Sequence, residues 1–358
     1  MKSKLAFLLP SFEEGGVEKV TINLAYGLRS MGYDVEFVVF KKQGAFLSEV
    51  EKEFTIHELK INRSSESIFK LVTYFKQNRP DFFISAKHYI NTNVLIAKLL
   101  SRTKTKIIVS GHGMFFKRRG LLPFLMKVTY TKADAIVAVS NGVGKNISEI
   151  TNISADKITV IHNPVISEEF IQTYQQTNAY VKPDGYKLIL SIGRLSPEKD
   201  YTTLIKAFHK VREHHPVKLM IVGEGPERDK LQETINELNL NEDVALPGFK
   251  KNPIGYLKAA DLFVLSSLTE GLPTVLIESL YCKTPIVSTD CPSGPDEILC
   301  NGEYGKLTPV GDAGQLAEAI EHSLLQAETD VTRLRDRALD FTSEKATKKY
   351  DLLINSLM

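Results

Sequence analysis

The stretch Ser266–Glu278, SSLTEGLPTVLIE, decides the fold of this chain and points to a ligand. It follows an apolar run, Asp261–Leu265, that is typical of a buried strand, and it continues into a segment with the pattern of a helix. The Gly-Leu-Pro-Thr turn between them puts Pro273 at the predicted first helical position. Backbone N–H groups at the start of such a helix favour a bound phosphate group.

Two glutamates, Glu270 and Glu278, lie on either side of this predicted phosphate site. A carboxylate next to an anion is costly unless it binds neutral hydroxyl groups, so the pair favours a ligand that carries both phosphate and sugar. A capped helix with two acidic residues on its surface is the alternative that this stretch leaves open.

The composition indicates a soluble globular protein. The 358 residues are 43% hydrophobic and 25% charged, and they are enough for two domains of about 150 residues each. No apolar run is long enough for a transmembrane helix. We expect the apolar N-terminal residues to form a strand rather than a signal peptide, and Cys282, Cys291 and Cys300 to be reduced thiols in a cytoplasmic protein.

Charge is distributed unevenly along the chain. Residues 1–165 hold 24 Lys and Arg against 14 Asp and Glu, a net charge of +10; because the whole chain carries +2, the remainder carries −8. The basic half could therefore face nucleic acid, anionic lipid or a phosphorylated substrate.

Both halves alternate short apolar runs with longer amphipathic segments, the pattern of parallel sheets covered by helices. The strands predicted in the first half are Leu5–Leu9, Asp34–Phe40, Phe54–Glu58, Phe82–Ser85, Lys106–Ser110, Ala135–Val139 and Ile158–Ile161. Those predicted in the second half are Lys187–Ile192, Val217–Val222, Val244–Leu246, Leu262–Leu265, Ile286–Ser288 and Gly305–Leu307. The helices expected between them include Glu18–Met31, Ile68–Asn78, Asp200–His214, Glu227–Leu238, Pro253–Ala260, Pro273–Cys282 and Ala313–Leu325.

Two successive patterns of this kind predict two doubly wound α/β domains. Asn163-Pro164 and the polar stretch 166–185 suit the joint between them, since proline restricts the residue before it and cannot continue a helix. We therefore expect one domain at residues 1–165 and another at 166–341. Residues 342–358 are expected to form a helix that crosses back to the first domain.

Glycines follow the first predicted strand of each half. Gly15-Gly16 would lie at the carboxyl edge of its sheet, where open α/β sheets bind ligands, although a plain strand-to-helix turn would look the same. Gly193 begins a loop that carries Arg194 and Lys199. These cations could neutralise a pyrophosphate leaving group, or they could be solvated surface charges.

Two further loops carry weaker signals. His112 lies between two glycines after the strand 106–110, where it could contact a substrate, although a lone histidine is usually structural. Gly223 and Gly225 form a G-x-G after the strand 217–222, which is a weak indication of a binding loop.

Together these segments resemble the GT-B glycosyltransferases of the large retaining family 4 type, which includes phosphatidylinositol mannosyltransferases, sucrose synthases and many bacterial polysaccharide enzymes. The resemblance covers nearly the whole chain. It is most specific in Glu270-x7-Glu278, in the Gly193-Arg194…Lys199 loop and in the turn 223–226. It implies a GT-B fold, with two Rossmann-like domains facing across a cleft, an N-terminal one for the acceptor and a C-terminal one for a nucleotide sugar.

The resemblance also assigns roles to residues by position. Glu270 resembles the residue that holds the hydroxyls of the donor sugar, and Glu278 the one that binds the ribose. The residues implied in catalysis are His112, Arg194, Lys199 and Glu270. Those implied in donor binding are Gly15, Gly16, Gly193, Gly223, Phe249, Lys250, Gly271, Leu272, Thr274 and Glu278.

The sequence contains no D-x-D, the acidic metal clamp of the other main transferase fold. We therefore expect no metal and no cofactor, with Arg194, Lys199 and helix N-termini meeting the charge of the diphosphate. We further expect the anomeric configuration to be retained, with the leaving phosphate assisting the incoming hydroxyl on the same face of the sugar.

The segment 98–132 mixes aromatic and aliphatic residues with cations, which is the composition of a segment that lies on a membrane surface. A helix that faces the core and has a solvated basic side is the alternative. Nucleic acid is disfavoured because no binding module is recognised and the second half is acidic. We expect peripheral attachment to the inner face of the cytoplasmic membrane.

The expected activity is the transfer of a hexose or N-acetylhexosamine from a nucleotide-diphosphate sugar, with UDP as the nucleotide, to a lipid-diphosphate-linked saccharide in bacterial surface polysaccharide or glycan assembly. The stretch 270–278 most resembles N-acetylgalactosaminyl and related transferases that act on undecaprenyl-diphosphate-linked sugars. The alternatives are a GT-B nucleotide-sugar 2-epimerase, which the basic segment disfavours, and a non-catalytic sugar-nucleotide-binding protein. The joint presence of Glu270, Lys199, Arg194 and His112 disfavours the latter.

Overall fold

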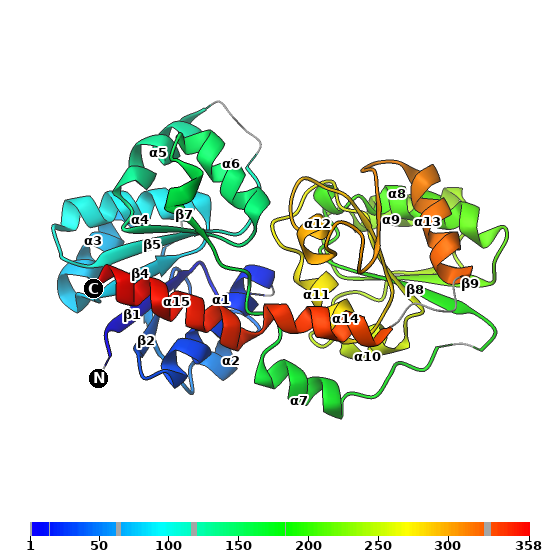
Figure 1. Cartoon of the computed structure of the whole chain (residues 1–358), viewed down its shortest axis with the longest axis horizontal. Helices are drawn as coiled ribbons and strands as arrows, with labels where there is room; N and C mark the ends of the chain where they lie inside the picture. Colours follow the sequence, from blue (N-terminus) through cyan, green and yellow to red (C-terminus); the bar gives the residue numbers. More distant parts are fainter. Residues whose placement is uncertain (1, 14, 62–65, 116–119, 183, 326–330) are drawn as a thin grey trace. The chain divides into compact units, whose positions relative to one another are not determined.

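The computed structural model consists of two compact units, each a parallel sheet with helices on both faces (Figure 1). Unit 1 comprises residues 1–164 and 343–358, and unit 2 comprises residues 165–342. The structure describes all residues except 1, 14, 62–65, 116–119, 183 and 326–330.

The sheet of unit 1 has the strand order β3-β2-β1-β4-β5-β6-β7. Its strands are β1 (Lys4–Leu9), β2 (Asp34–Val39), β3 (Thr55–Glu58), β4 (Phe82–Ser85), β5 (Lys106–Gly111), β6 (Ala135–Ala138) and β7 (Ile158–Val160). Its helices are α1 (Gly16–Ser30), α2 (Leu47–Val50), α3 (Ser67–Asn78), α4 (His88–Ser101), α5 (Leu121–Thr129), α6 (Asn141–Thr151) and α15 (Ser343–Leu357).

One face of this sheet is covered by α1 and by the C-terminal helix α15, which pack against each other (Figure 1, blue and red). Because side chains alternate between the two faces of a strand, Leu5, Phe7 and Leu9 of β1 all point into this core. Ile354 of α15 is fully buried there. On the other face, α3, α4, α5 and α6 form a row of neighbouring helices. The helix 343–357 is thus part of the core of unit 1.

The sheet of unit 2 has the order β10-β9-β8-β11-β12-β13. Its strands are β8 (Lys187–Ile192), β9 (Val217–Val222), β10 (Val244–Ala245), β11 (Leu262–Leu265), β12 (Ile286–Thr289) and β13 (Lys306–Thr308). Its helices are α7 (Glu168–Gln176), α8 (Tyr201–Arg212), α9 (Arg228–Glu237), α10 (Ile254–Ala259), α11 (Thr274–Tyr281), α12 (Pro295–Ile298), α13 (Ala313–Leu325) and α14 (Val331–Ala338). Helices α8, α9 and α13 supply the apolar core on one face.

Both sheets have a switch point, a place where successive connections leave neighbouring strands in opposite directions. It lies between β1 and β4 in unit 1 and between β8 and β11 in unit 2. In open α/β sheets ligands bind outside the carboxyl ends of the strands at this point. The loops at the carboxyl ends of the strands that flank these two switch points are therefore the candidate ligand-binding loops.

The doubly wound α/β fold class is confirmed, and a strand is found at each predicted position. The prediction for Pro273 is wrong by one residue: helix α11 begins at Thr274, and Pro273 is the N-cap residue with extended backbone, φ −68° and ψ 101°. In the described part of the chain, no helix combines the length and the apolar character that crossing a membrane requires.

Replacing Ile354 by Ala should destabilise unit 1, because it leaves a cavity between α15 and the sheet. The expected loss is about 2–5 kcal/mol of the free energy of unfolding, measured as a lower midpoint of the urea transition of this unit. Leu352→Ala is the matched control, since Leu352 lies on the same helix and is 62% exposed. Equal effects of the two substitutions would show that α15 does not belong to this core.

Candidate active site

In unit 2, an ion pair joins the loop after β8 to the loop after β11 at the switch point. The ammonium group of Lys199 lies 2.6 Å from Oε1 of Glu270, and both side chains are largely buried, with 17% and 12% of their surface exposed. The Ser267 hydroxyl donates to the same oxygen over 2.6 Å. In the described part of the chain, no hydrogen bond reaches Oε2 of Glu270. That oxygen is left to accept hydrogen bonds from a ligand.

Backbone contacts hold these two loops in register. The Ser266 hydroxyl donates to the carbonyl oxygen of Lys199 over 2.8 Å, and the Leu268 N–H donates to the carbonyl oxygen of Glu198 over 2.8 Å. Two hydrogen bonds from the loop after β11 therefore hold the backbone at Glu198 and Lys199. Arg194 lies two residues after the end of β8 and is exposed. Among the described residues its guanidinium has no hydrogen-bonded partner, so this group is available to an anion.

Glycine is required where the loops after β8 and β9 touch. A Cβ atom on Gly223 would lie 1.9 Å from the carbonyl oxygen of Gly193, which is backbone and cannot move aside. A Cβ on Gly193 would lie 2.7 Å from the buried hydroxyl of Tyr201. The Gly223 N–H donates to Gly248 of the following loop over 3.1 Å. Gly193 and Gly223, both predicted to bind the donor, thus allow a close approach of backbones at this edge.

The loop after β10 reaches the same edge through that bond. It carries Phe249, which is 41% exposed, and Lys250, which is half-buried. By contrast, the carboxylate of Glu224 in the G-x-G turn is paired with Arg228, the first residue of α9. The distance from Nη2 of Arg228 to Oε1 of Glu224 is 2.6 Å. This guanidinium, through its hydrogen bonds and charge, lowers the pKa of the Glu224 carboxyl. Glu224 is therefore already neutralised, whereas Phe249 and Lys250 face outward.

The N-terminus of α11 completes this part of the site. No side chain caps it, and Gly271 and Leu272 before it are buried, with the Ser293 hydroxyl donating to the Gly271 carbonyl oxygen over 2.8 Å. Thr274 is its first residue, and Glu278 lies one turn later and only 7% exposed. Residues four apart share a helix face. Unit 2 thus brings its predicted site residues to one sheet edge.

In unit 1, Gly15 and Gly16 lie at the start of α1. Gly15 is the N-cap residue with extended backbone, and a Cβ there would lie 2.2 Å from a carboxylate oxygen of Glu18. Glu18 is buried and forms an ion pair with Lys87, in which Oε1 of Glu18 lies 2.7 Å from Nζ of Lys87. Lys87 is the N-cap residue of α4, two residues after β4 ends. This ion pair therefore joins the first turn of α1 to the connection after β4, across the switch point in unit 1.

His112 follows β5 and is held by Ser110, whose hydroxyl lies 3.0 Å from Nε2. Its Nδ1 is buried and has no partner in the described structure. Burial, together with the neighbouring His88 and the positive charge of Lys87, lowers the pKa of His112 to about 3. The imidazole is therefore neutral at physiological pH, and it can exchange hydrogen bonds but does not act as a cation.

Two neighbours brace the histidine. Nε2 of His88 lies 3.0 Å from the Gly113 carbonyl oxygen, and Nδ1 of His88 lies 3.0 Å from the Tyr130 hydroxyl. These contacts fix the loop that carries His112. Tyr350 of α15 lines, with Ser110 and His112, a cavity of about 20 Å³. That is room for one water molecule.

Sequence reasoning did not find Glu18, Lys87, Ser267 or Tyr350. Glu18 and Tyr350 sit on amphipathic helices, where charged and aromatic residues usually have ordinary roles. Lys87 carried one usable signal, because it lies two residues after a predicted strand of a parallel sheet. Ser267 was inside the quoted stretch but was not given a role.

Solved structures that are similar to this chain include glycosyltransferases. A glycosyltransferase from Rickettsia africae superposes with a TM-score of 0.83 at 20% identity, covering 99% of this chain and 98% of that one. HepE from Anabaena, in complex with UDP and glucose, superposes with a TM-score of 0.81 at 20% identity, covering 99% and 100%. The two parallel-sheet units are therefore those of the GT-B fold.

Two family models match the chain in succession. The model described as Glycosyltransferase Family 4 matches residues 14–169, and the one described as Glycosyl transferases group 1 matches residues 173–338. An uncharacterized glycosyltransferase of Methanocaldococcus jannaschii is 30% identical over 88% of this chain and 88% of its own length. The chain belongs to this glycosyltransferase family, as its motifs predicted.

One similar protein has a specific activity in its name. It is the N-acetylgalactosamine-N,N'-diacetylbacillosaminyl-diphospho-undecaprenol 4-alpha-N-acetylgalactosaminyltransferase of Campylobacter jejuni, and it is 29% identical over 94% of this chain and 96% of its own length. The resemblance to enzymes that act on lipid-linked sugars is thus confirmed at the level of homologous proteins.

His112 should remain neutral between pH 5 and pH 8, because its pKa is lowered to about 3. NMR titration of histidine-labelled protein, with His112→Gln to assign the signal, should show no midpoint for this residue near the usual value of about 6.5. Since the unfolded chain binds this proton at about pH 6.5, stability should fall as the pH drops from there toward 3. A midpoint near 6.5 would contradict the assignment.

Proposed function

We propose that this chain is a retaining glycosyltransferase that moves a hexose or N-acetylhexosamine from a UDP-sugar to a saccharide carried on a lipid diphosphate. The observation that carries the proposal is the Lys199–Glu270 pair, which places a cation and a carboxylate with one unused oxygen beside the uncapped N-terminus of α11. A cation and a helix N-terminus suit a diphosphate, whereas the carboxylate suits sugar hydroxyls.

Each part of the donor has a matching group in unit 2. Arg194 and Lys199 are assigned to the diphosphate, Glu270 to the sugar hydroxyls and Glu278 to the ribose. Phe249, which is exposed, and Lys250 are assigned to the base. UDP as the nucleotide is supported by HepE, which is similar in fold and is solved with UDP and glucose.

We assign the charge of the leaving group to Lys199, Arg194 and the N-terminus of α11, with no metal ion in the reaction. In the described part of the chain, no three His, Cys, Asp or Glu side chains are grouped so that they could hold a metal. Cations placed in advance where negative charge develops stabilise a transition state without reorganising during the reaction. The protein's own cations supply this charge in the proposal.

Retention is proposed from the resemblance to the retaining family, and a same-face route without a covalent intermediate is proposed because Glu270 is poorly suited to be a nucleophile. Its Oε1 already accepts from Lys199 and Ser267, both over 2.6 Å. The bond from the anomeric carbon to the diphosphate breaks, and the bond to the acceptor oxygen forms on the same face. The leaving phosphate takes the proton of the acceptor hydroxyl. His112, neutral and with a free Nδ1 among the described residues, is assigned to a hydrogen bond with a sugar hydroxyl.

The lipid-linked acceptor is supported by the Campylobacter jejuni relative and by the surface of α5. Leu121, Phe124 and Val128 of this helix are 74%, 62% and 52% exposed and share one face. A helix with a solvated basic side would instead bury its large apolar residues. Lys127 and Lys132 lie beside this face, and residues 116–119, which were also predicted to contact the membrane, lie outside the described residues. We assign this face to peripheral contact with the inner leaflet.

Lys199→Ala should lower kcat by more than tenfold, because a charge-assisted contact to the leaving group acts in the transition state. Turnover is measured as UDP release from a panel of UDP-sugars with and without a lipid-linked acceptor. Lys206→Ala is the control, since Lys206 lies exposed on the adjacent α8. Unchanged turnover in Lys199→Ala would reject the assignment.

The same assay separates the alternatives. A 2-epimerase would change the donor sugar without an acceptor, and a non-catalytic binding protein would bind UDP without any release. The anomeric configuration of the product, read by NMR, tests retention, and an inverted product would overturn that part of the proposal.

Leu121→Ser together with Phe124→Ser should weaken co-sedimentation with phosphatidylglycerol vesicles by at least tenfold. Burying two such side chains contributes about 1.5–3 kcal/mol each. Val181→Ser with Leu352→Ser is the control, because both residues are exposed and lie outside α5. Equal loss in both double variants would remove α5 from the membrane contact.

A further inference from the structure

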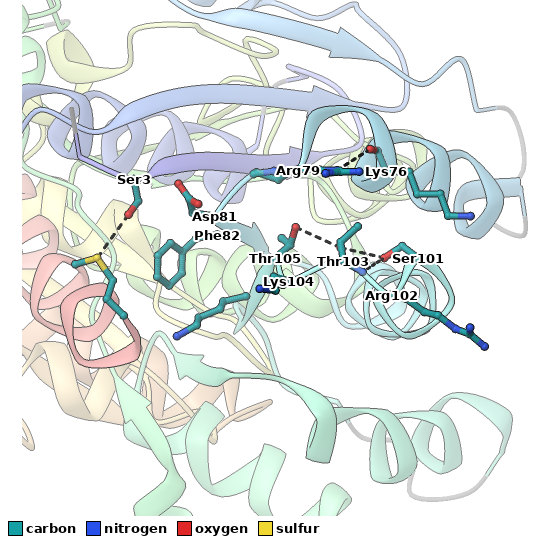
Figure 2. A pocket seen from close by; sticks show the side chains of 13 residues that line it. Ser3, Lys76, Arg79, Asp81, Phe82, Ser101, Arg102, Thr103, Lys104 and Thr105 are labelled. Atoms are coloured by element: carbon teal, nitrogen blue, oxygen red, sulfur yellow. Dashed lines mark hydrogen bonds between the residues drawn. The ribbon is translucent and has the colours of Figure 1, made fainter.

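A cavity of about 760 Å³ lies at the amino edge of the sheet in unit 1. It is formed where α3 and α4 end and where β4 and β5 begin (Figure 2). Lys106 is the first residue of β5, and His112 follows the last one. Six residues of strand span about 20 Å, so this cavity is separate from the carboxyl edge that carries His112.

Five cations line this cavity: Lys76, Arg79, Arg102, Lys104 and Lys106. In the described part of the chain, none of them lies within 4 Å of a carboxylate. Asp81 is the one acidic side chain among the described lining residues, and its Oδ2 already accepts from the Lys4 N–H over 2.7 Å. The cavity therefore concentrates positive charge that the protein itself does not neutralise.

Helix ends account for part of this charge but not for all of it. Cations near a helix C-terminus compensate its dipole. Lys76 lies in the last turn of α3, and Arg79, its left-handed C-cap residue, donates to the Lys76 carbonyl oxygen over 3.3 Å. Lys104 and Lys106 lie beyond the end of α4, on the connection to β5 and on β5 itself. These two lysines face the cavity without serving a helix end.

We infer that this cavity is a binding site for a ligand bearing phosphate groups, either a soluble diphosphate compound or the headgroup of an anionic lipid. Its volume is that of a small-molecule site rather than of a single ion. Guanidinium and ammonium groups are the side chains that bind phosphate by charge-assisted hydrogen bonds. Figure 2 shows Lys76 and Arg79 on one side and Arg102 and Lys104 on the other. This inference does not rest on the transfer reaction proposed above.

A lipid source has one additional argument in its favour. Leu99 and Leu100, in the last turn of α4, are 54% and 55% exposed and directly precede the cavity-lining Ser101 and Arg102. An apolar surface next to a cationic pocket matches the two ends of an anionic lipid. The experiment below therefore includes one arm for each source.

Lys76→Gln with Lys104→Gln removes two exposed cations from the lining, and Lys52→Gln with Lys157→Gln removes two exposed cations of unit 1 outside it. Binding of pyrophosphate is measured by calorimetry in the presence of saturating UDP, so that the proposed donor site is occupied. Binding of phosphatidylglycerol vesicles, against phosphatidylcholine vesicles, is measured by co-sedimentation.

The lining variant should bind at least one of the two probes at least tenfold more weakly than the control variant and the unchanged protein. Loss of pyrophosphate binding identifies a soluble phosphate compound, and loss of vesicle binding alone identifies a lipid headgroup. Equal binding of both probes by the lining and control variants overturns the inference. An unchanged midpoint of the urea transition of unit 1 shows that the lining variant is folded, and because the substitutions lie outside unit 2, failure of the transferase assay leaves this result unaffected.

Discussion

The ion pair between Lys199 and Glu270 is the constraint on which the geometry of the candidate site in unit 2 depends. It closes the switch point between β8 and β11, and it is mostly buried. Breaking such a pair leaves one charge unpaired in a poorly solvated place, which is strongly unfavourable. The pair therefore adds to the backbone contacts that already join these two loops. It also holds Glu270 by one oxygen and presents the other. A cation that is already in place needs no reorganisation when charge develops on a leaving group.

Unit 1 uses the same construction with the charges exchanged. In unit 2 the lysine follows the first strand of the sheet and the carboxylate follows the fourth. In unit 1 the carboxylate of Glu18 follows the first strand and Lys87 follows the fourth, 2.7 Å away. In both units these two strands are neighbours whose connections leave in opposite directions, so no further strand separates the two loops. A pair of oppositely charged side chains can therefore join them directly. Lys87 also adds, after burial and the neighbouring His88, to the lowering of the pKa that keeps His112 neutral.

The fold could be predicted from sequence because parallel strands buried on both faces are continuous apolar runs, and each run was visible. Residues of the site could be predicted where a turn or glycine marks them, as at Gly193 and Glu270. The pairing of side chains could not be predicted, since Lys199 and Glu270 are 71 residues apart and only the strand order brings them together. Glu18 could not be predicted either, because a buried glutamate on an amphipathic helix looks like a surface residue. The helix start at Pro273 was misjudged because proline fits both the N-cap and the first helical position.

The excess positive charge of the first 165 residues is distributed differently at the two edges of the sheet in unit 1. At the carboxyl edge of unit 1, Lys87 is neutralised by Glu18 and His112 is uncharged, so this edge attracts anions weakly. At the amino edge, five cations line one cavity and have no acidic partner in the described structure. Because β5 separates the two edges by about 20 Å, one sheet can present a carboxyl edge whose lysine is paired and an amino edge whose five cations have no acidic partner in the described structure.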